Sequence, residues 1–160
     1  MIRCFILDDE LPAIKVLKRY IKKMPQVVLI GYETNPLRGM ARILQEKPDL
    51  VFLDIQMDDM NGIDVMRIIR QQTKVVFCTA YSEYAVTSYE LEAVDYLLKP
   101  IEFERFVKAV QRVESLLQQE EPVAQRGDYI YVKRGLRGKF LKVDYADIDY
   151  VQASGNYVRI

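Results

Sequence analysis

Polar residues suited to phosphoryl chemistry follow the apolar runs of this sequence. Six of them stand at or just after the end of a short apolar run: Asp8, Asp9, Glu10, Asp54, Thr79 and Lys99. Clustered carboxylates repel one another, and a hard divalent cation such as Mg²⁺, which prefers oxygen ligands, relieves that repulsion. A carboxylate can also attack phosphorus to form an acyl phosphate, whose oxygens an ammonium group, a hydroxyl group and a metal ion neutralise. These residue types predict a phosphoryl-transfer site, provided that the fold brings them together.

Each residue also has a simpler interpretation when it is taken alone. Asp9 is equally well placed to be the N-cap of a following helix. Asp54 fits a cap less well, because the next helix signal, Asn61-Gly62, comes only after several intervening residues. A lone Thr79 is more often an ordinary strand residue, and a lone Lys99 is more often solvated. Only the joint placement at the ends of the runs favours a shared site.

The apolar runs have the character of buried strands. Five are short, rich in Val, Ile, Leu and Phe, and barely alternate with polar residues, which is typical of strands buried on both faces: Ile2–Leu7, Val27–Ile30, Leu50–Leu53, Val75–Cys78 and Val94–Leu98. Between them, apolar residues recur at the helical steps of three and four. The helical pattern is weakest over residues 82–91.

Repeated alternation of strand and helix predicts an α/β fold, a five-stranded parallel sheet with helices on both faces. Because crossover connections are right-handed, the C-terminal ends of all the strands lie at one edge of the sheet. Ligands bind at that edge. The polar residues that follow the runs are therefore expected to meet there, except after the second run, where Gly31-Tyr32 offers nothing reactive.

The pattern changes after residue 120. Residues 121–127 are polar, contain Pro122 and are typical of a linker. Residues 128–160 contain two short strand patterns around the turn signal 134–138 and then further strand pattern. So short a segment cannot bury a core of its own. We expect a partial β-rich segment, the start of a second domain that is cut at Ile160.

Composition excludes several function classes. The 160 residues include 23 Lys+Arg, 23 Asp+Glu and no histidine, which rules out Ser-His-Asp catalysis and a His-ligated zinc ion. The balanced charge gives no whole-chain attraction to nucleic acid. Cys4 and Cys78 lie in apolar runs and are expected to be buried free thiols, which suits a cytoplasmic location. No signal peptide and no membrane-inserted segment are expected, because no run approaches the roughly 20 apolar residues that span a bilayer.

As an ordered set, several motifs resemble the receiver domain of bacterial two-component response regulators: FILDDE, LVFLDIQM, MNGID, VVFCTAYSEYA and AVDYLLKP. The resemblance covers residues 1–120. It implies a flavodoxin-like fold with five helices and strand order 2-1-3-4-5. It also implies that Asp54 accepts a phosphoryl group from a sensor histidine kinase. In the implied metal site, Asp9 binds Mg²⁺ directly and Asp8 binds it through water, with Asp54 and the backbone carbonyl of Gln56 as further ligands.

The same resemblance assigns the remaining site residues. Lys99 pairs with the phosphoryl group, Thr79 moves to bond it, and Tyr96 turns inward behind Thr79. The small side chain of Ala80 leaves the path to the phosphoryl group open. The peptide bond before Pro100 is cis, a geometry confined almost entirely to proline.

One residue departs from the family pattern. Many receivers have proline four residues after the phosphorylated aspartate, where this sequence has Asp58, followed by Asp59. The substitution is expected to loosen the loop and to add negative charge near the metal.

The tail, residues 128–160, resembles the start of a LytTR-type DNA-binding domain. The resemblance implies a transcription regulator that binds DNA only as the full-length protein. Arg134, Arg137 and Lys139 are candidates for phosphate contacts, although charged hairpin loops are usually only solvated. An unrelated β-hairpin extension is the alternative.

The switch itself is expected to act through self-association. Thr79 and Tyr96 flank the weakly patterned stretch 82–91, a plausible movable element. Phosphorylation is therefore expected to rearrange a surface built from residues 82–91, 94–98 and 102–117 and to favour a homodimer.

Three other functions compete with a signalling switch. A Mg²⁺-dependent phosphatase with an aspartate nucleophile needs a general acid two residues later, and Gln56 in that position cannot serve. A phosphorylation-independent binding module would not need Asp9, Asp54, Thr79 and Lys99 together. A flavin carrier lacks a phosphate-binding loop after the first run. We therefore expect a switch that holds its phosphoryl group rather than a turnover enzyme.

Overall fold

The computed structural model describes residues 1–80, 93–120, 129–134, 139–144, 148, 152–154 and 157–159. The chain divides into two compact units, Met1–Gln118 and Gln119–Ile160. Two predicted segments, the helix over 82–91 and the linker over 121–127, lie outside the described residues.

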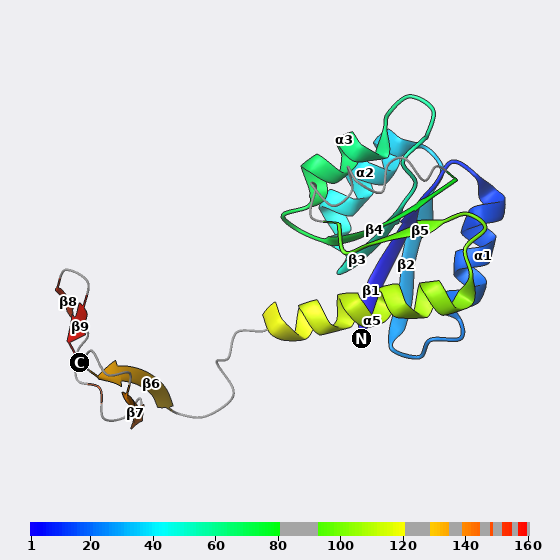
Figure 1. Ribbon diagram of the computed structural model, residues 1–160. Coiled ribbons are helices and arrows are strands. Elements are labelled where there is room, and N and C mark those ends of the chain that lie inside the picture. The colour runs from blue at the N-terminus through cyan, green and yellow to red at the C-terminus, as the bar shows by residue number, and fades with distance from the viewer. Residues whose placement is uncertain are drawn as a thin grey trace. The chain divides into compact units, whose positions relative to one another are not determined.

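A single parallel sheet forms the centre of the first unit (Figure 1). Its strands are β1 (Ile2–Leu7), β2 (Val27–Glu33), β3 (Leu50–Leu53), β4 (Lys74–Thr79) and β5 (Asp95–Leu98). Their order across the sheet is β2-β1-β3-β4-β5, and every neighbouring pair is parallel. This arrangement confirms the predicted flavodoxin-like fold.

The second strand is longer than its apolar run. We expected it to end at Ile30, before Gly31, but β2 continues to Glu33. The backbone explains the difference, because Tyr32 and Glu33 pair with the last two residues of β1. Hydrogen bonding along an edge strand does not require apolar side chains, so the apolar pattern ends before the strand does.

Four helices are described in the first unit: α1 (Leu11–Ile21), α2 (Pro36–Glu46), α3 (Gly62–Ile69) and α5 (Phe103–Glu120). Asparagine N-caps start two of them, because the side chains of Asn35 and Asn61 accept hydrogen bonds from the first turns of α2 and α3. Across the described ranges, none of the helices combines the length and the apolar character needed to cross a bilayer.

The core has two halves, one on each face of the sheet. Alternate residues of β1 point to opposite faces, so Cys4 and Ile6 join one cluster while Phe5 and Leu7 join the other. The first cluster includes apolar residues of α1 and α5, and the second includes residues of α2 and α3. The strands are therefore buried on both faces, as predicted. Cys4 and Cys78 are free and buried, also as predicted.

The second unit contains two antiparallel strand pairs. The first joins β6 (Tyr129–Arg134) to β7 (Lys139–Asp144), and the second joins β8 (Gln152–Ser154) to β9 (Tyr157–Arg159). These pairs confirm the predicted strands on either side of the turn signal and in the segment after it.

Candidate functional site

The polar residues lie at one edge of the sheet, at the carboxyl ends of four strands. Asp8 follows β1, Asp54 follows β3, Thr79 ends β4 and Lys99 follows β5. A pocket of about 190 Å³ opens at this edge. Its lining contains most of the residues singled out in the sequence: Asp9, Glu10, Asp54, Gln56, Thr79, Ala80 and Lys99. The fold therefore brings together residues that are far apart in the chain.

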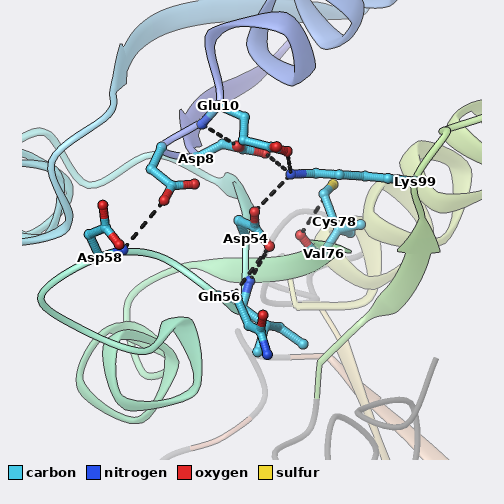
Figure 2. Close-up of polar contacts among 10 residues, drawn as sticks. Asp8, Glu10, Asp54, Gln56, Asp58, Val76, Cys78 and Lys99 are labelled. Carbon is cyan, nitrogen blue, oxygen red and sulfur yellow. Dashed lines mark hydrogen bonds and ion pairs between the residues drawn. The ribbon is translucent and has the colours of Figure 1, made fainter. Parts of the chain in front are cut away.

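The ammonium group of Lys99 lies among three carboxylates (Figure 2). Its Nζ is 2.7 Å from Oδ2 of Asp54, 2.8 Å from Oε2 of Glu10 and 2.9 Å from Oδ2 of Asp8. Burial by itself would lower the pKa of Lys99, but the hydrogen bonds to these carboxylates outweigh it and raise the pKa. Lys99 is therefore a permanent positive charge at neutral pH.

The carboxylate of Asp54 is buried and held at both oxygens. Oδ1 accepts hydrogen bonds from the backbone N–H groups of Ile55, at 2.6 Å, and Gln56, at 3.4 Å. Oδ2 accepts the bond from Lys99. Burial raises the pKa of Asp54, and the contacts with Lys99 oppose that rise. The side chain is thus fixed at the floor of the pocket.

Asp8 is the most deeply buried carboxylate of the group, with 1% of the residue exposed. Its Oδ1 accepts a hydrogen bond from the backbone N–H of Glu10 at 2.9 Å. Burial raises the pKa of Asp8 from 3.8 to about 6, against the opposing effect of Lys99. The charged form of Asp8 is therefore costly in this buried position.

Asp9 is not the cap of the following helix. The N-cap residue of α1 is Glu10, and no side-chain hydrogen bond caps this helix. The carboxylate of Asp9 instead lines the pocket and accepts a long hydrogen bond, 3.4 Å, from the backbone N–H of Asp58. A proline at position 58 would lack this N–H group. The interpretation of Asp9 as the N-cap of the following helix is therefore wrong.

The loop after Asp54 is shaped by a close backbone contact. Gly62 donates a hydrogen bond from its N–H to the carbonyl of Ile55 at 2.7 Å, and a Cβ atom at this position would collide with the backbone carbonyl of Asp54. Asp59 has a φ of 67°, in the left-handed region that side chains other than those of Gly, Asn and Asp rarely adopt. The loop that carries Asp54 is thus tied closely to the start of α3.

The other predicted residues take distinct places. Thr79 is buried, whereas Gln56 and Ala80 are exposed at the mouth of the pocket. Tyr96 is partly buried and packs against the apolar cluster that contains α3, and it is not among the described residues that line the pocket. The Lys99–Pro100 peptide bond is cis, as predicted.

The donor set fits a hard divalent cation. Among the described residues, Asp8, Glu10 and Asp54 each place a carboxylate oxygen within 4.8 Å of the others, and all-oxygen sites of this kind suit Mg²⁺. Asp8 and Asp54 belong to the predicted ligand set, and Asp9 lines the same pocket. Glu10 was expected at this edge with the other carboxylates, but without a role of its own. Its place beside two aspartates was visible in the sequence, but its contact with Lys99 depends on the sheet.

Comparison with known proteins assigns the family. The family model of the response regulator receiver domain matches residues 4–111, the part of the chain that carries the sheet and the pocket. The chain therefore belongs to the response regulator receiver family, whose members act as signalling switches.

Individual relatives agree with this assignment. An uncharacterized response regulatory protein of Vibrio cholerae is 42% identical over 115 residues, which are 71% of this chain and 48% of the relative. The sensory transduction protein LytT of Bacillus cereus is 35% identical, over 70% of this chain and 47% of the relative. The transcriptional regulatory protein BtsR of Escherichia coli is 34% identical, over 71% and 48%. The chain matches about half the length of these relatives.

Among solved structures, the response regulatory domain of mrkE from Klebsiella pneumoniae has a TM-score of 0.69 at 30% identity. The alignment covers 74% of this chain and 99% of that domain. The receiver domain of AraT from Geobacillus stearothermophilus also has a TM-score of 0.69, at 25% identity over 75% of this chain and 98% of that one.

Proposed function

We propose that this chain is a phosphorylation switch in which Asp54 accepts a phosphoryl group from a phosphohistidine of a sensor histidine kinase. The observation that carries the proposal is the pair formed by Asp54 and Lys99 on the floor of an acidic pocket. A buried carboxylate at the open end of a sheet can reach an incoming phosphoryl group, and an ammonium group beside it can neutralise the charge that arrives.

In the proposed reaction, a carboxylate oxygen of Asp54 forms a bond to phosphorus as the phosphorus–nitrogen bond of the phosphohistidine breaks. The imidazole nitrogen keeps the electron pair of that bond, and the product on the chain is an acyl phosphate. The backbone N–H groups of Ile55 and Gln56 fix the attacking carboxylate, and Lys99 offsets the charge of the phosphoryl oxygens.

We propose that Asp8, Asp9, Asp54 and the backbone carbonyl of Gln56 hold Mg²⁺. When bound, the metal ion would neutralise phosphoryl oxygens during the transfer. The acidic oxygen donors support this assignment, because without a cation several carboxylates share one ammonium group.

Thr79 and Tyr96 are proposed to report the phosphorylated state. The buried hydroxyl of Thr79 ends the strand between β3 and β5, next to the pocket, and can bond a phosphoryl oxygen after a small movement. Tyr96 then turns inward behind it. Exposed Ala80 leaves the path to the pocket open.

A turnover phosphatase is the weaker alternative. Position 56, where such an enzyme needs its general acid, lines the pocket as a glutamine, which has no ionisable proton to give a leaving group. The chain is therefore proposed to hold its phosphoryl group as a signal.

We propose that the β-rich segment 128–160 belongs to a LytTR-type DNA-binding domain of a cytoplasmic transcription regulator. Two antiparallel strand pairs and the names of the relatives LytT and BtsR support this output. Phosphorylation is proposed to favour a homodimer through 94–98 and 102–117, together with 82–91, which lies outside the described residues.

Intact-mass spectrometry tests the phosphoacceptor. After incubation with acetyl phosphate and Mg²⁺, the protein should gain one phosphoryl mass that hydroxylamine removes. Asp54→Asn should gain none, since an amide does not attack phosphorus, and Asp64→Asn, which removes an exposed carboxylate from α3, should behave like the unmodified sequence. Equal labelling of Asp54→Asn would overturn the assignment.

Sedimentation with and without beryllofluoride, a phosphoryl mimic, tests the proposed dimer. The expected result is tighter self-association with the mimic. The size of the change is limited by the difference between the affinities of the mimic for the two conformations of the switch. A gel shift with a promoter bound by the full-length protein tests the output. The residues of the segment 128–160 named for DNA contacts, Arg134, Arg137 and Lys139, are candidates for phosphate contacts only. Phosphate contacts alone do not specify sequence, so the 160-residue chain should give no sequence-specific shift by itself.

A further inference from the structure

The ammonium group of Lys99 is closely surrounded by carboxylates. Its Nζ donates hydrogen bonds to Glu10 and Asp54 and forms an ion pair with Asp8, so that three carboxylate oxygens lie within 2.9 Å of it. Only 13% of the Lys99 side chain is exposed. A phosphoryl group that is to pair with Lys99 must therefore displace one of the present partners.

The three partners differ sharply in exposure. The side chains of Asp8 and Asp54 are 1% and 6% exposed, whereas that of Glu10 is 62% exposed. A buried carboxylate that loses its cation is left charged without compensation, which is strongly unfavourable. An exposed carboxylate is rehydrated by water, and its ion pair is worth little to begin with. Glu10 is thus the partner that leaves most easily.

The side chain of Glu10 has no competing structural duty in the described chain. Glu10 is the N-cap residue of α1, but it makes no side-chain cap, and the hydrogen bond it donates to Asp8 comes from its backbone. Figure 2 shows its carboxylate directed away from the helix and toward Lys99. A substitution that removes only the charge of Glu10 therefore leaves α1 and the fold unchanged.

We propose that Glu10 is a positioning residue that occupies Lys99 while Asp54 is unphosphorylated and opposes the arrival of a phosphoryl group. This inference rests on the proposed function. A phosphoryl group brings up to two negative charges to the ammonium that Glu10 now contacts. The carboxylate of Glu10 must then give up Lys99 and is repelled by the new charge. Glu10 thereby shifts the balance toward the unphosphorylated state.

The charge-only variant Glu10→Gln tests this inference by calorimetric titration with beryllofluoride at saturating Mg²⁺, so that any change in metal affinity does not enter. Glu10→Gln should bind beryllofluoride about two- to fivefold more tightly than the unmodified sequence, the range for one exposed ion pair. The difference should shrink at high ionic strength, since salt screens exposed charges. Glu10→Asp, which keeps the charge on a shorter side chain, should fall between the two.

The matched control is Asp64→Asn. Asp64 pairs with Arg67 on α3 at 2.9 Å, and both side chains are exposed, so this variant removes the same charge from another exposed pair, outside the proposed dimer surface, and should leave the affinity unchanged. Equal or weaker binding by Glu10→Gln, or a difference that salt does not change, would overturn the role of Glu10 while the switch itself stands. No response to beryllofluoride in the unmodified sequence would overturn the proposed function, and the role of Glu10 with it.

Discussion

Nζ of Lys99 lies 2.7 Å from Oδ2 of Asp54, although 45 positions separate the two residues in the chain. The strands that carry them, β5 and β3, are not neighbours, because β4 lies between them. Lys99 therefore reaches across the end of β4, where Thr79 is buried. In the proposed function, this placement allows one ammonium group, one hydroxyl group and one carboxylate to contact the same phosphoryl group.

The pH dependence of stability should reveal the buried carboxylates. Burial raises the pKa of Asp8 from 3.8 to about 6, so the folded state binds more protons than the unfolded state between these values. The free energy of unfolding of the metal-free protein should therefore fall as pH rises from about 4 to about 6. Asp54, whose pKa is also raised by burial, should contribute in the same direction.

Asp8→Asn isolates the contribution of Asp8. The amide has no charge to desolvate, so the variant should be more stable than the unmodified sequence at pH 7 without metal, by about 1–2 kcal/mol. Urea denaturation across this pH range measures the effect. A fall of stability with pH that is as steep in Asp8→Asn as in the unmodified sequence would contradict the prediction.

Asp9→Asn should weaken Mg²⁺ binding and leave the fold intact. The variant removes a charged candidate ligand, and Asp9 caps no helix. We expect a loss of about tenfold or more in affinity by calorimetric titration, comparable to the loss of a group that supports a metal ligand. Asp64→Asn is the control for the loss of an exposed carboxylate elsewhere. An unchanged Mg²⁺ titration would show that Asp9 takes no part in the metal site.

Gly62→Ala should damage the loop that carries Asp54. The added Cβ atom would collide with the backbone carbonyl of Asp54, and backbone cannot move aside as a side-chain tip can. We expect a loss of about 1–3 kcal/mol in the free energy of unfolding and slower phosphorylation by acetyl phosphate, measured by urea denaturation and intact mass.

Gly39→Ala is the control for the glycine prediction. Gly39 lies inside α2, and its added Cβ atom would crowd the buried side chain of Leu7, whereas that of Gly62 would meet backbone; alanine also favours the helix. This variant should keep its rate of phosphorylation. The prediction fails if the two alanine variants lose stability and phosphorylation rate equally.

Lys47→Gly should stabilise the first unit. Lys47 ends α2 with a φ of 46° and a ψ of 65°, a left-handed conformation that favours glycine. Its side chain is exposed, and the hydrogen bond that its carbonyl accepts from Arg3 survives the substitution. We expect a gain of about 1 kcal/mol, seen as a higher melting temperature. Lys47→Ala keeps the Cβ atom and should show no such gain.

The sequence by itself determined the strands, the fold class and most of the site. The runs Ile2–Leu7 and Leu50–Leu53 coincide with β1 and β3, because strands buried on both faces need apolar side chains at nearly every position. Once the strands alternate with helices, chain connectivity forces Asp54, Thr79 and Lys99 to the same edge of the sheet. Local pattern and handedness are enough for that inference.

Only the tertiary structure decided which charged groups at that edge contact one another. The sequence left Asp9 open between helix cap and pocket residue, and the fold turned its carboxylate toward Asp58 and the pocket. It also gave Glu10 a contact with Lys99 and extended β2 through Tyr32 to Glu33 by pairing with β1. These outcomes depend on distances between segments far apart in the chain, and such distances exist only after the sheet has assembled.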